Sequence, residues 1–106
     1  MAKTHGGEGQ TSFATSEPGA LRGGHYHRRK IERFAVLLGT GRISMRRMFT
    51  EEVQTFDVDG DDEVVIDMPT MWTHDITNIG DETLYLGLWI SEVFRPERPD
   101  TIREPV

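Results

Sequence analysis

Residues 19–39 read GALRGGHYHRRKIERFAVLLG and combine a His-Tyr-His triplet, a glutamate and a short apolar run between two glycines. In an extended strand, residues two positions apart point to the same face, so the imidazoles of His25 and His27 can reach one point. Glu32 follows five residues after His27, at the start of the apolar run. Two histidines that alternate with a tyrosine also occur in ordinary strands, so this pair alone does not establish a metal site.

Short apolar runs separated by turn residues continue along the rest of the chain. They predict strands at residues 11–16, 33–38, 42–48, 53–58, 63–68, 73–79 and 84–90. The segments Gly39-Thr40-Gly41 and Gly80-Asp81 predict hairpin connections between consecutive strands. No segment repeats its apolar residues with the period of a helix, so long helices are not expected. The pattern is typical of an all-β sandwich or barrel.

Length, charge and cysteine content narrow the class of protein. A chain of 106 residues predicts one domain, residues 1–106, with residues 1–10 poorly ordered and residues 94–106 forming an extended tail that contains prolines. The net charge of −6 disfavours nucleic acid and anionic membranes as partners, and no apolar run is long enough for a membrane helix. The absence of cysteine excludes disulfides, thiolate metal ligands and cysteine nucleophiles. We expect a cytoplasmic protein.

The spacing of the polar residues resembles the two motifs of the cupin superfamily. Residues 19–39 match G-x5-H-x-H-x4-E-x6-G at every fixed position, and residues 69–78 (PTMWTHDITN) resemble P-x-G-x2-H-x3-N, with His74 as its histidine. The resemblance implies a double-stranded β-helix, also called a jelly-roll barrel. Met71 stands where the family has glycine, so a positive φ angle at this position would be strained.

His25, His27, Glu32 and His74 form the predicted metal site. Three neutral imidazoles and one carboxylate are a mixed nitrogen and oxygen ligand set that suits divalent transition metals. We expect zinc as the cofactor, with iron, manganese, nickel or cobalt as alternatives. Burying these four groups without a metal would cost free energy unless each of them were paired.

A narrower resemblance covers residues 19–106. It is carried by residues 23–27 (GGHYH), 30–34 (KIERF), 67–70 (DMPT), 73–81 (THDITNIGD) and 96–101 (PERPDT). These segments resemble the C-terminal cupin domain of bifunctional UDP-sugar epimerase–reductases of capsular polysaccharide biosynthesis. The resemblance implies that the cupin epimerises a 4-keto UDP-sugar at C3, and that a separate short-chain-dehydrogenase domain then reduces the product with NADPH.

The reductase activity does not carry over, because this chain has no G-x-G-x-x-G motif after a predicted strand. We therefore expect a reductase partner domain or partner protein. The family's domain has strand sequence before the point at which this chain begins, so we expect an excised or shortened domain. A sheet edge left without its neighbouring strand would favour a homodimer.

Epimerisation next to a ketone needs a group that moves the proton, and a metal ligand cannot serve as that base while it is bound. The candidates for proton transfer are Tyr26, Lys30 and Tyr85. Arg22 and Arg28 are candidates for clamping the diphosphate of a nucleotide sugar.

Two further polar residues are expected to support the ligands. Asp75 follows His74 directly, and Asn78 is the last residue of the second motif. Hydrogen bonds from such neighbours orient metal ligands and set which nitrogen of an imidazole carries the proton.

Three alternative functions stay open at this point. Cupin dioxygenases use a similar His/Glu set around Fe(II), and iron content together with oxygen uptake would identify that class. A barrel that binds a sugar without turnover would show tight binding but no deuterium exchange at C3. In dTDP-sugar epimerases and ketoisomerases of the same broad barrel, a histidine near the position of His25 acts as base without a metal.

Overall fold

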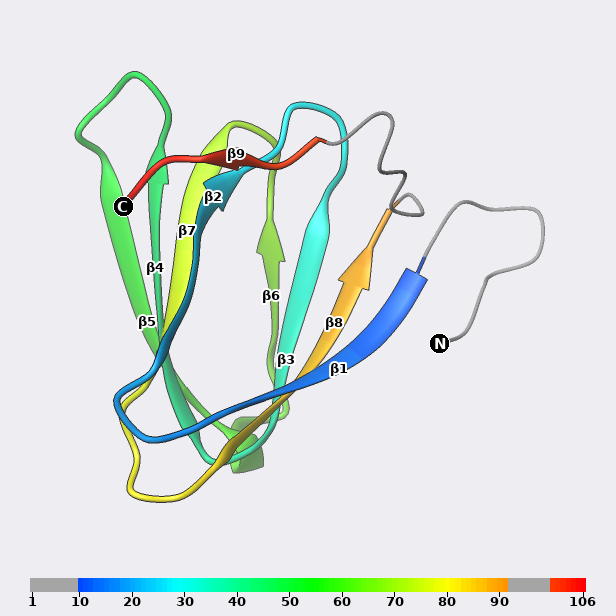
Figure 1. The fold of residues 1–106 in the computed structure, drawn as a ribbon, viewed down its shortest axis with the longest axis vertical. Coiled ribbons are helices and arrows are strands. Elements are labelled where there is room, and N and C mark those ends of the chain that lie inside the picture. Colours follow the sequence, from blue (N-terminus) through cyan, green and yellow to red (C-terminus); the bar gives the residue numbers. More distant parts are fainter. Residues whose placement is uncertain (1–9, 92–99) are drawn as a thin grey trace.

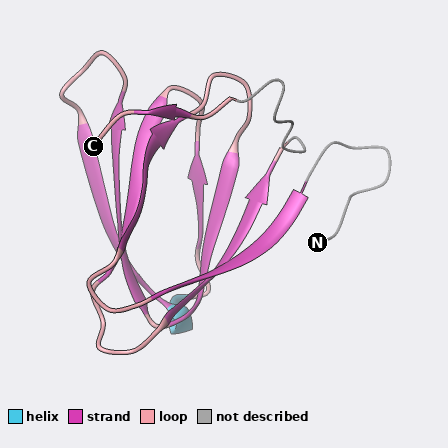
Figure 2. Cartoon of the chain, in the orientation of Figure 1, coloured by secondary structure: helices cyan, strands magenta, loops and turns pink. Residues whose placement is uncertain are grey.

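A computed structural model describes residues 10–91 and 100–106 of the chain, and this part is built almost entirely of antiparallel strands (Figure 1). The elements in chain order are β1 (Gln10–Ser16), β2 (Leu21–Tyr26), β3 (Glu32–Leu38), β4 (Thr40–Arg47), β5 (Val53–Asp59), the 3-10 helix η1 (Gly60–Asp62), β6 (Val65–Met68), β7 (Trp72–Asn78), β8 (Leu84–Ile90) and β9 (Ile102–Arg103). Figure 2 shows η1 as a single short turn at one end of the barrel. The all-β prediction and the absence of long helices are confirmed for the described residues.

The strands form two sheets that face each other. One sheet has the order β1-β8-β3-β6, and the other has the order β5-β4-β7-β2-β9. The inner faces enclose an apolar core of nine buried side chains: Phe34, Val36, Ile43, Met45, Val58, Met68, Ile76, Leu84 and Leu86. Alternation is clearest in β3, β4 and the first half of β8, where every second residue is buried between the sheets, as in a jelly-roll barrel.

Both connections that we expected to be hairpins run between the two sheets instead. Strands β3 and β4 lie on either side of Gly39, but β3 pairs with β6 and β8, whereas β4 pairs with β5 and β7. The turn at Gly80-Asp81 likewise leads from β7 in one sheet to β8 in the other. Gly39 has a φ of 96°, and a Cβ there would lie 3.1 Å from the carbonyl oxygen of Thr83, so both the backbone conformation and the close packing at this corner favour glycine.

Strand β2 contains a bulge that decides which of its side chains enter the barrel. The register with β7 runs from Arg22 opposite Ile76 to His25 opposite His74, and the extra residue shifts the alternation between Gly23 and His25. Arg22 and His25 would face opposite sides of a regular strand because they are three residues apart. The bulge places both on the inner face, opposite Ile76 and His74.

Gly23 allows β2 to approach β7 closely at this bulge. Its φ is 105°, and a Cβ on Gly23 would lie 2.7 Å from the carbonyl oxygen of His74. Gly24 also has a positive φ, of 79°, but a Cβ there would meet no atom within 4 Å. The two glycines therefore have different roles, close packing at Gly23 and backbone conformation alone at Gly24.

Met71 has a φ of 66°, in the left-handed region that the resemblance assigned to glycine. Its backbone is held on both sides, since its N–H donates to the carbonyl of His27 and its carbonyl accepts from Met48. The turn before β7 thus has a left-handed backbone at a non-glycine residue, which is the condition under which strain was expected at this position.

Of the expected tail, residues 94–99 lie outside the described part of the chain, as do residues 1–9 at the other end. Residues 100–106 are extended and cross the end of β2, where β9 pairs with His25 and Tyr26 (Figure 1). Arg46 of β4 holds the last residues through contacts with Glu104, Pro105 and Val106. No helix in the described part of the chain has the length and apolar character needed to cross a membrane.

Candidate metal centre

The four predicted ligands come from three strands and one loop and meet inside the barrel. His25 lies on β2, His27 directly after it, Glu32 at the start of β3 and His74 on β7. One ligand atom from each residue lies within 4.8 Å of the others. The structure thus brings the four predicted side chains together. Pairing of β2 with β7 sets His25 beside His74, and β3 brings Glu32 from the opposite sheet.

Glu32 is at the centre of the group. Its Oε1 lies 3.5 Å from Nε2 of His25 and 3.5 Å from Nε2 of His74, and it is in direct contact with Nε2 of His27. Burial alone would raise the pKa of the Glu32 carboxyl, but hydrogen bonds from Nε2 protons of the three imidazoles outweigh burial and hold the pKa well below its usual value; a bound metal would take the place of these protons. The carboxylate is therefore charged, as a metal ligand must be.

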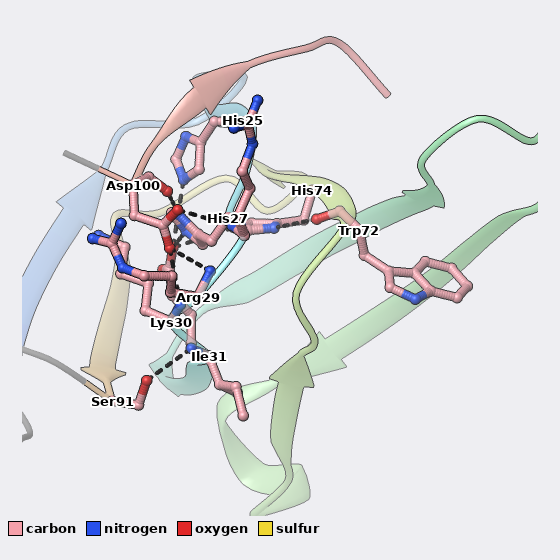
Figure 3. Close-up of polar contacts among 11 residues, drawn as sticks. His25, His27, Arg29, Lys30, Ile31, Trp72, His74, Ser91 and Asp100 are labelled. Carbon is pink, nitrogen blue, oxygen red and sulfur yellow. Dashed lines mark hydrogen bonds and ion pairs between the residues drawn. The ribbon is translucent and has the colours of Figure 1, made fainter. Parts of the chain in front are cut away.

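The other ring nitrogens of two histidines are oriented by backbone carbonyls (Figure 3). Nδ1 of His27 lies 2.7 Å from the carbonyl oxygen of Asp100, and Nδ1 of His74 lies 3.2 Å from that of Trp72. A carbonyl oxygen only accepts, so each Nδ1–H is the donor and each Nε2 faces the cluster. Nε2 of His74 is buried and has no hydrogen-bond partner in the described chain. A divalent metal would satisfy this nitrogen, so the donor set fits such an ion.

The cluster lies beside a cavity of about 70 Å³. Its walls are largely apolar and include Phe34, Ile76, Leu86 and Leu88. The side chain of His25 is 27% exposed, whereas those of His27 and His74 are almost fully buried, so access to the ligands is from the His25 side. Such a cavity combines apolar walls with a few convergent polar groups, as small-molecule sites do.

Of the two predicted diphosphate clamps, only Arg22 lines the cavity. Arg28 is exposed in the loop after His27, and its backbone N–H donates to the Asp100 carboxylate. The position of Arg22 depends on the β2 bulge, which turns it toward the same side as His25.

None of the three residues predicted for proton transfer lines this cavity. Tyr26 alternates with His25 on β2 and is buried on the other face of the sheet. Tyr85 alternates with the buried Leu84 and Leu86, and 43% of it is exposed on the outer face of the first sheet. Lys30 is buried in the loop before β3, where its backbone N–H donates to Asp100.

Asp75 and Asn78 were predicted to support the ligands. Within the described part of the chain, neither side chain forms a hydrogen bond with a ligand. Asp75 follows His74 and therefore faces the other side of β7, where burial raises the pKa of its carboxyl against the opposing effect of His74. Asn78 fixes the turn after β7, since its side-chain nitrogen donates to the carbonyls of Ser16 and Glu82 and its oxygen accepts from Gly80. Asn78 therefore stabilises the far end of the barrel.

Sequence analysis missed Asp100, whose carbonyl orients His27 and whose carboxylate accepts hydrogen bonds from three backbone N–H groups. A signal was available, because Asp100 lies within residues 96–101, one of the segments that carried the narrower resemblance. Its contact with His27 spans 73 positions in the chain, so no local pattern could reveal it.

Comparisons with known proteins agree with this fold and with the narrower resemblance. Residues 1–102 match the family described as polysaccharide biosynthesis C-terminal domain. The chain is 42% identical over 93 residues to a UDP-2-acetamido-2,6-beta-L-arabino-hexul-4-ose reductase of Pseudomonas aeruginosa. The aligned residues make up 88% of this chain and 25% of the relative.

Solved structures of related proteins share this fold. The capsular polysaccharide assembling protein CapF of Staphylococcus aureus superposes with a TM-score of 0.93 at 38% identity, covering 98% of this chain and 30% of that protein. A dTDP-4-dehydrorhamnose 3,5-epimerase of Elizabethkingia anophelis shares the fold, with a TM-score of 0.71 at 17% identity over 83% of this chain and 52% of that protein. The chain thus spans between 25% and 30% of the first two relatives. It belongs to the polysaccharide biosynthesis C-terminal domain family, and its fold is that of a cupin.

Proposed function

We propose that this domain is a metal-dependent epimerase that inverts C3 of a 4-keto UDP-sugar in surface polysaccharide biosynthesis. The observation that carries the proposal is the position of the His/Glu cluster, which lies beside an apolar cavity whose rim carries Arg22. Because the chain covers only part of its relatives, this activity is assigned from the site and supported by what the relatives' names state.

The substrate class follows from those names together with the chemistry of a ketone. The Pseudomonas relative is named for a UDP-sugar with a ketone at C4, and the Elizabethkingia neighbour for epimerisation of a 4-keto nucleotide sugar. A proton on C3 is acidic because C3 adjoins the C4 carbonyl, and its removal leaves negative charge on the carbonyl oxygen. Returning the proton to the other face of C3 completes the epimerisation without any net oxidation or reduction.

His25, His27, Glu32 and His74 would hold the metal, for which zinc is the first choice. A divalent ion in this position supplies Lewis-acid stabilisation of the charge that develops on the carbonyl oxygen. The apolar walls at Phe34 and Leu88 exclude water, which strengthens electrostatic interactions inside the cavity. Arg22 would bind the diphosphate at the rim through its guanidinium.

The proton-transfer base is not assigned to any of the described residues. Among the described residues, the titratable side chains that line the cavity are those of Arg22 and of three predicted metal ligands, His25, Glu32 and His74. His25 is the most exposed member, which favours a second candidate mechanism in which no metal is bound and His25 removes the proton. Metal content separates the two mechanisms, because only the first requires about one ion per chain.

Two partners belong to this proposal. A reductase domain or protein outside these 106 residues would reduce the epimerised ketone. A second copy of the chain would cover the outer face of the β1-β8-β3-β6 sheet, where Phe13, Leu37, Val65 and Tyr85 are between 43% and 74% exposed. Exposed apolar faces of this kind are typical of protein interfaces, which supports the proposed dimer. Sedimentation analysis of the wild type and of Leu37→Asp tests this, because a wild-type monomer would contradict it.

The experiment that tests the proposed activity is solvent exchange at C3. The purified chain is loaded with zinc and incubated in D2O with a 4-keto UDP-sugar, and deuterium at C3 is measured by NMR. We expect exchange in the wild type and its loss in Glu32→Gln, with Asp57→Asn on an exposed ion pair as the matched control. Tight sugar binding without exchange in the zinc-loaded wild type would instead indicate a binding domain, and oxygen uptake with iron would indicate a dioxygenase.

A further inference from the structure

Asp100 holds the loop that joins two of the four ligands. Its Oδ1 accepts a hydrogen bond from the backbone N–H of Arg28 at 3.0 Å. Its Oδ2 accepts from the N–H groups of Arg29 at 2.7 Å and Lys30 at 2.9 Å. Three successive N–H groups thus converge on one carboxylate (Figure 3). Asp100 is only 5% exposed. Burial alone would raise the pKa of this carboxyl, but the three donors hold it below its usual value.

The same residue also orients one ligand directly. The carbonyl oxygen of Asp100 accepts the hydrogen bond from Nδ1 of His27. That bond requires the proton on Nδ1, so Nε2 is the nitrogen of His27 that faces the cluster and that would bind a metal through its lone pair. The side chain of Asp100 therefore fixes the loop from His27 to Glu32, and its main chain fixes the tautomer of His27.

The segment that carries Asp100 is anchored beyond it. The N–H of Glu104 donates to the carbonyl of Gly24, and the hydroxyl of Thr73 contacts the carbonyl of Glu104. These contacts join the C-terminal residues to β2 and β7, the two strands that carry His25 and His74. Asp100 is thus placed by a segment that contacts Gly24 and Thr73, the residues just before His25 and His74.

We propose that Asp100 is a positioning residue that sets the metal affinity of the cluster by holding His27 and the loop before Glu32 in a ligating arrangement. This inference rests on the proposed metal site and adds a residue that contacts neither metal nor substrate. Without the carboxylate, three N–H groups in this loop lose their acceptor, and His27 is free to turn.

The test compares Asp100→Asn with the wild type in zinc competition titrations against a chromophoric chelator. Asparagine keeps the size of the side chain but removes the charge and turns one acceptor into a donor. We expect zinc affinity to fall roughly 10- to 100-fold, as it does when partners behind a metal ligand are removed. Asp57→Asn is the matched control, because it removes an exposed ion pair between β4 and β5 that involves neither the loop nor a ligand, and its zinc affinity should equal that of the wild type.

A second measurement does not depend on how well the variant folds. In long-range 15N–1H spectra of the wild type, Nδ1 of His27 should carry a proton. An unprotonated Nδ1, or zinc affinity of folded Asp100→Asn within about twofold of the wild type, would overturn the inference. A wild type that binds no zinc at all would instead count against the proposed function, so the two failures are distinguishable.

Discussion

Nε2 of His74 lies 3.5 Å from Oε1 of Glu32, although the two residues belong to opposite sheets of the barrel. This nitrogen is buried and has no hydrogen-bond partner in the described chain. A buried polar atom without a partner costs free energy, and a cation shared by the carboxylate and the imidazoles would remove that cost. The free energy of unfolding should therefore depend on whether a metal ion is bound between His74 and Glu32.

Zinc is expected to stabilise the folded chain. At a free zinc concentration about 100 times the dissociation constant, the free energy of unfolding should rise by about 2.7 kcal/mol, provided that the unfolded chain does not bind the ion. Thermal unfolding with and without zinc measures this as a rise in Tm. His74→Asn should lose the effect and Asp57→Asn should keep it. An equal rise in His74→Asn would mean that zinc binds elsewhere.

Replacement of Met71 tests the strain in the turn before β7. Met71→Gly should be more stable than Met71→Ala by about 1 kcal/mol. Both substitutions remove the side chain beyond Cβ, but only glycine adopts a φ of 66° without strain. Urea unfolding of the two variants gives the difference in free energy. Equal stabilities would show that the left-handed conformation at this position costs nothing.

Substitution of Gly23 tests the close approach of β2 to β7. In Gly23→Ala the new Cβ would meet the carbonyl of His74 at 2.7 Å, whereas in Gly24→Ala it would meet nothing within 4 Å. Both variants share the conformational cost of a positive φ, so the difference between them isolates the clash. We expect Gly23→Ala to lose more stability and more zinc affinity than Gly24→Ala. The reverse order would rule out close packing at Gly23 as the reason for this bulge.

Arg22 is expected to bind the diphosphate of the substrate. Arg22→Gln should weaken UDP binding at least about tenfold, since a hydrogen bond between charged groups contributes about 1.5–3 kcal/mol. Isothermal titration measures the dissociation constant, and Arg42→Gln is the control because Arg42 is exposed and paired with Asp57. Unchanged binding in Arg22→Gln would place the diphosphate elsewhere.

The ligands were predictable because the spacing around His25, His27 and Glu32, and later around His74, resembles the two cupin motifs. Alternation along a strand alone showed only that His25 and His27 can reach one point. The glycine position of the motif identified Met71 as a place where a positive φ would be strained, and the structure shows a φ of 66° there. The sheet to which each strand belongs was not predictable, since the glycine corner at Gly39 has the same composition as a hairpin turn. A local pattern says where the chain turns but not which strand it pairs with next.

Two features of the site depend on contacts that no local pattern contains. Arg22 reaches the cavity because the bulge shifts the alternation of β2, and an unbroken alternation would have placed it opposite to His25. Asp100 reaches His27 from 73 positions away. Tyr26 and Tyr85 were predicted to transfer the proton because their hydroxyl groups can do so. Tyr26 follows the ligand His25 and Tyr85 lies between two buried leucines, so strand alternation turns both away from the cavity.

The most direct test of the metal centre is elemental analysis of the purified chain. The wild type and His74→Ala are compared after growth with zinc and iron supplied. We predict about one zinc ion per wild-type chain and its loss in His74→Ala, with circular dichroism showing that the variant keeps its strands. Iron in place of zinc would favour the dioxygenase alternative. A folded wild type that contains no metal would contradict the four-ligand centre and favour His25 as a base.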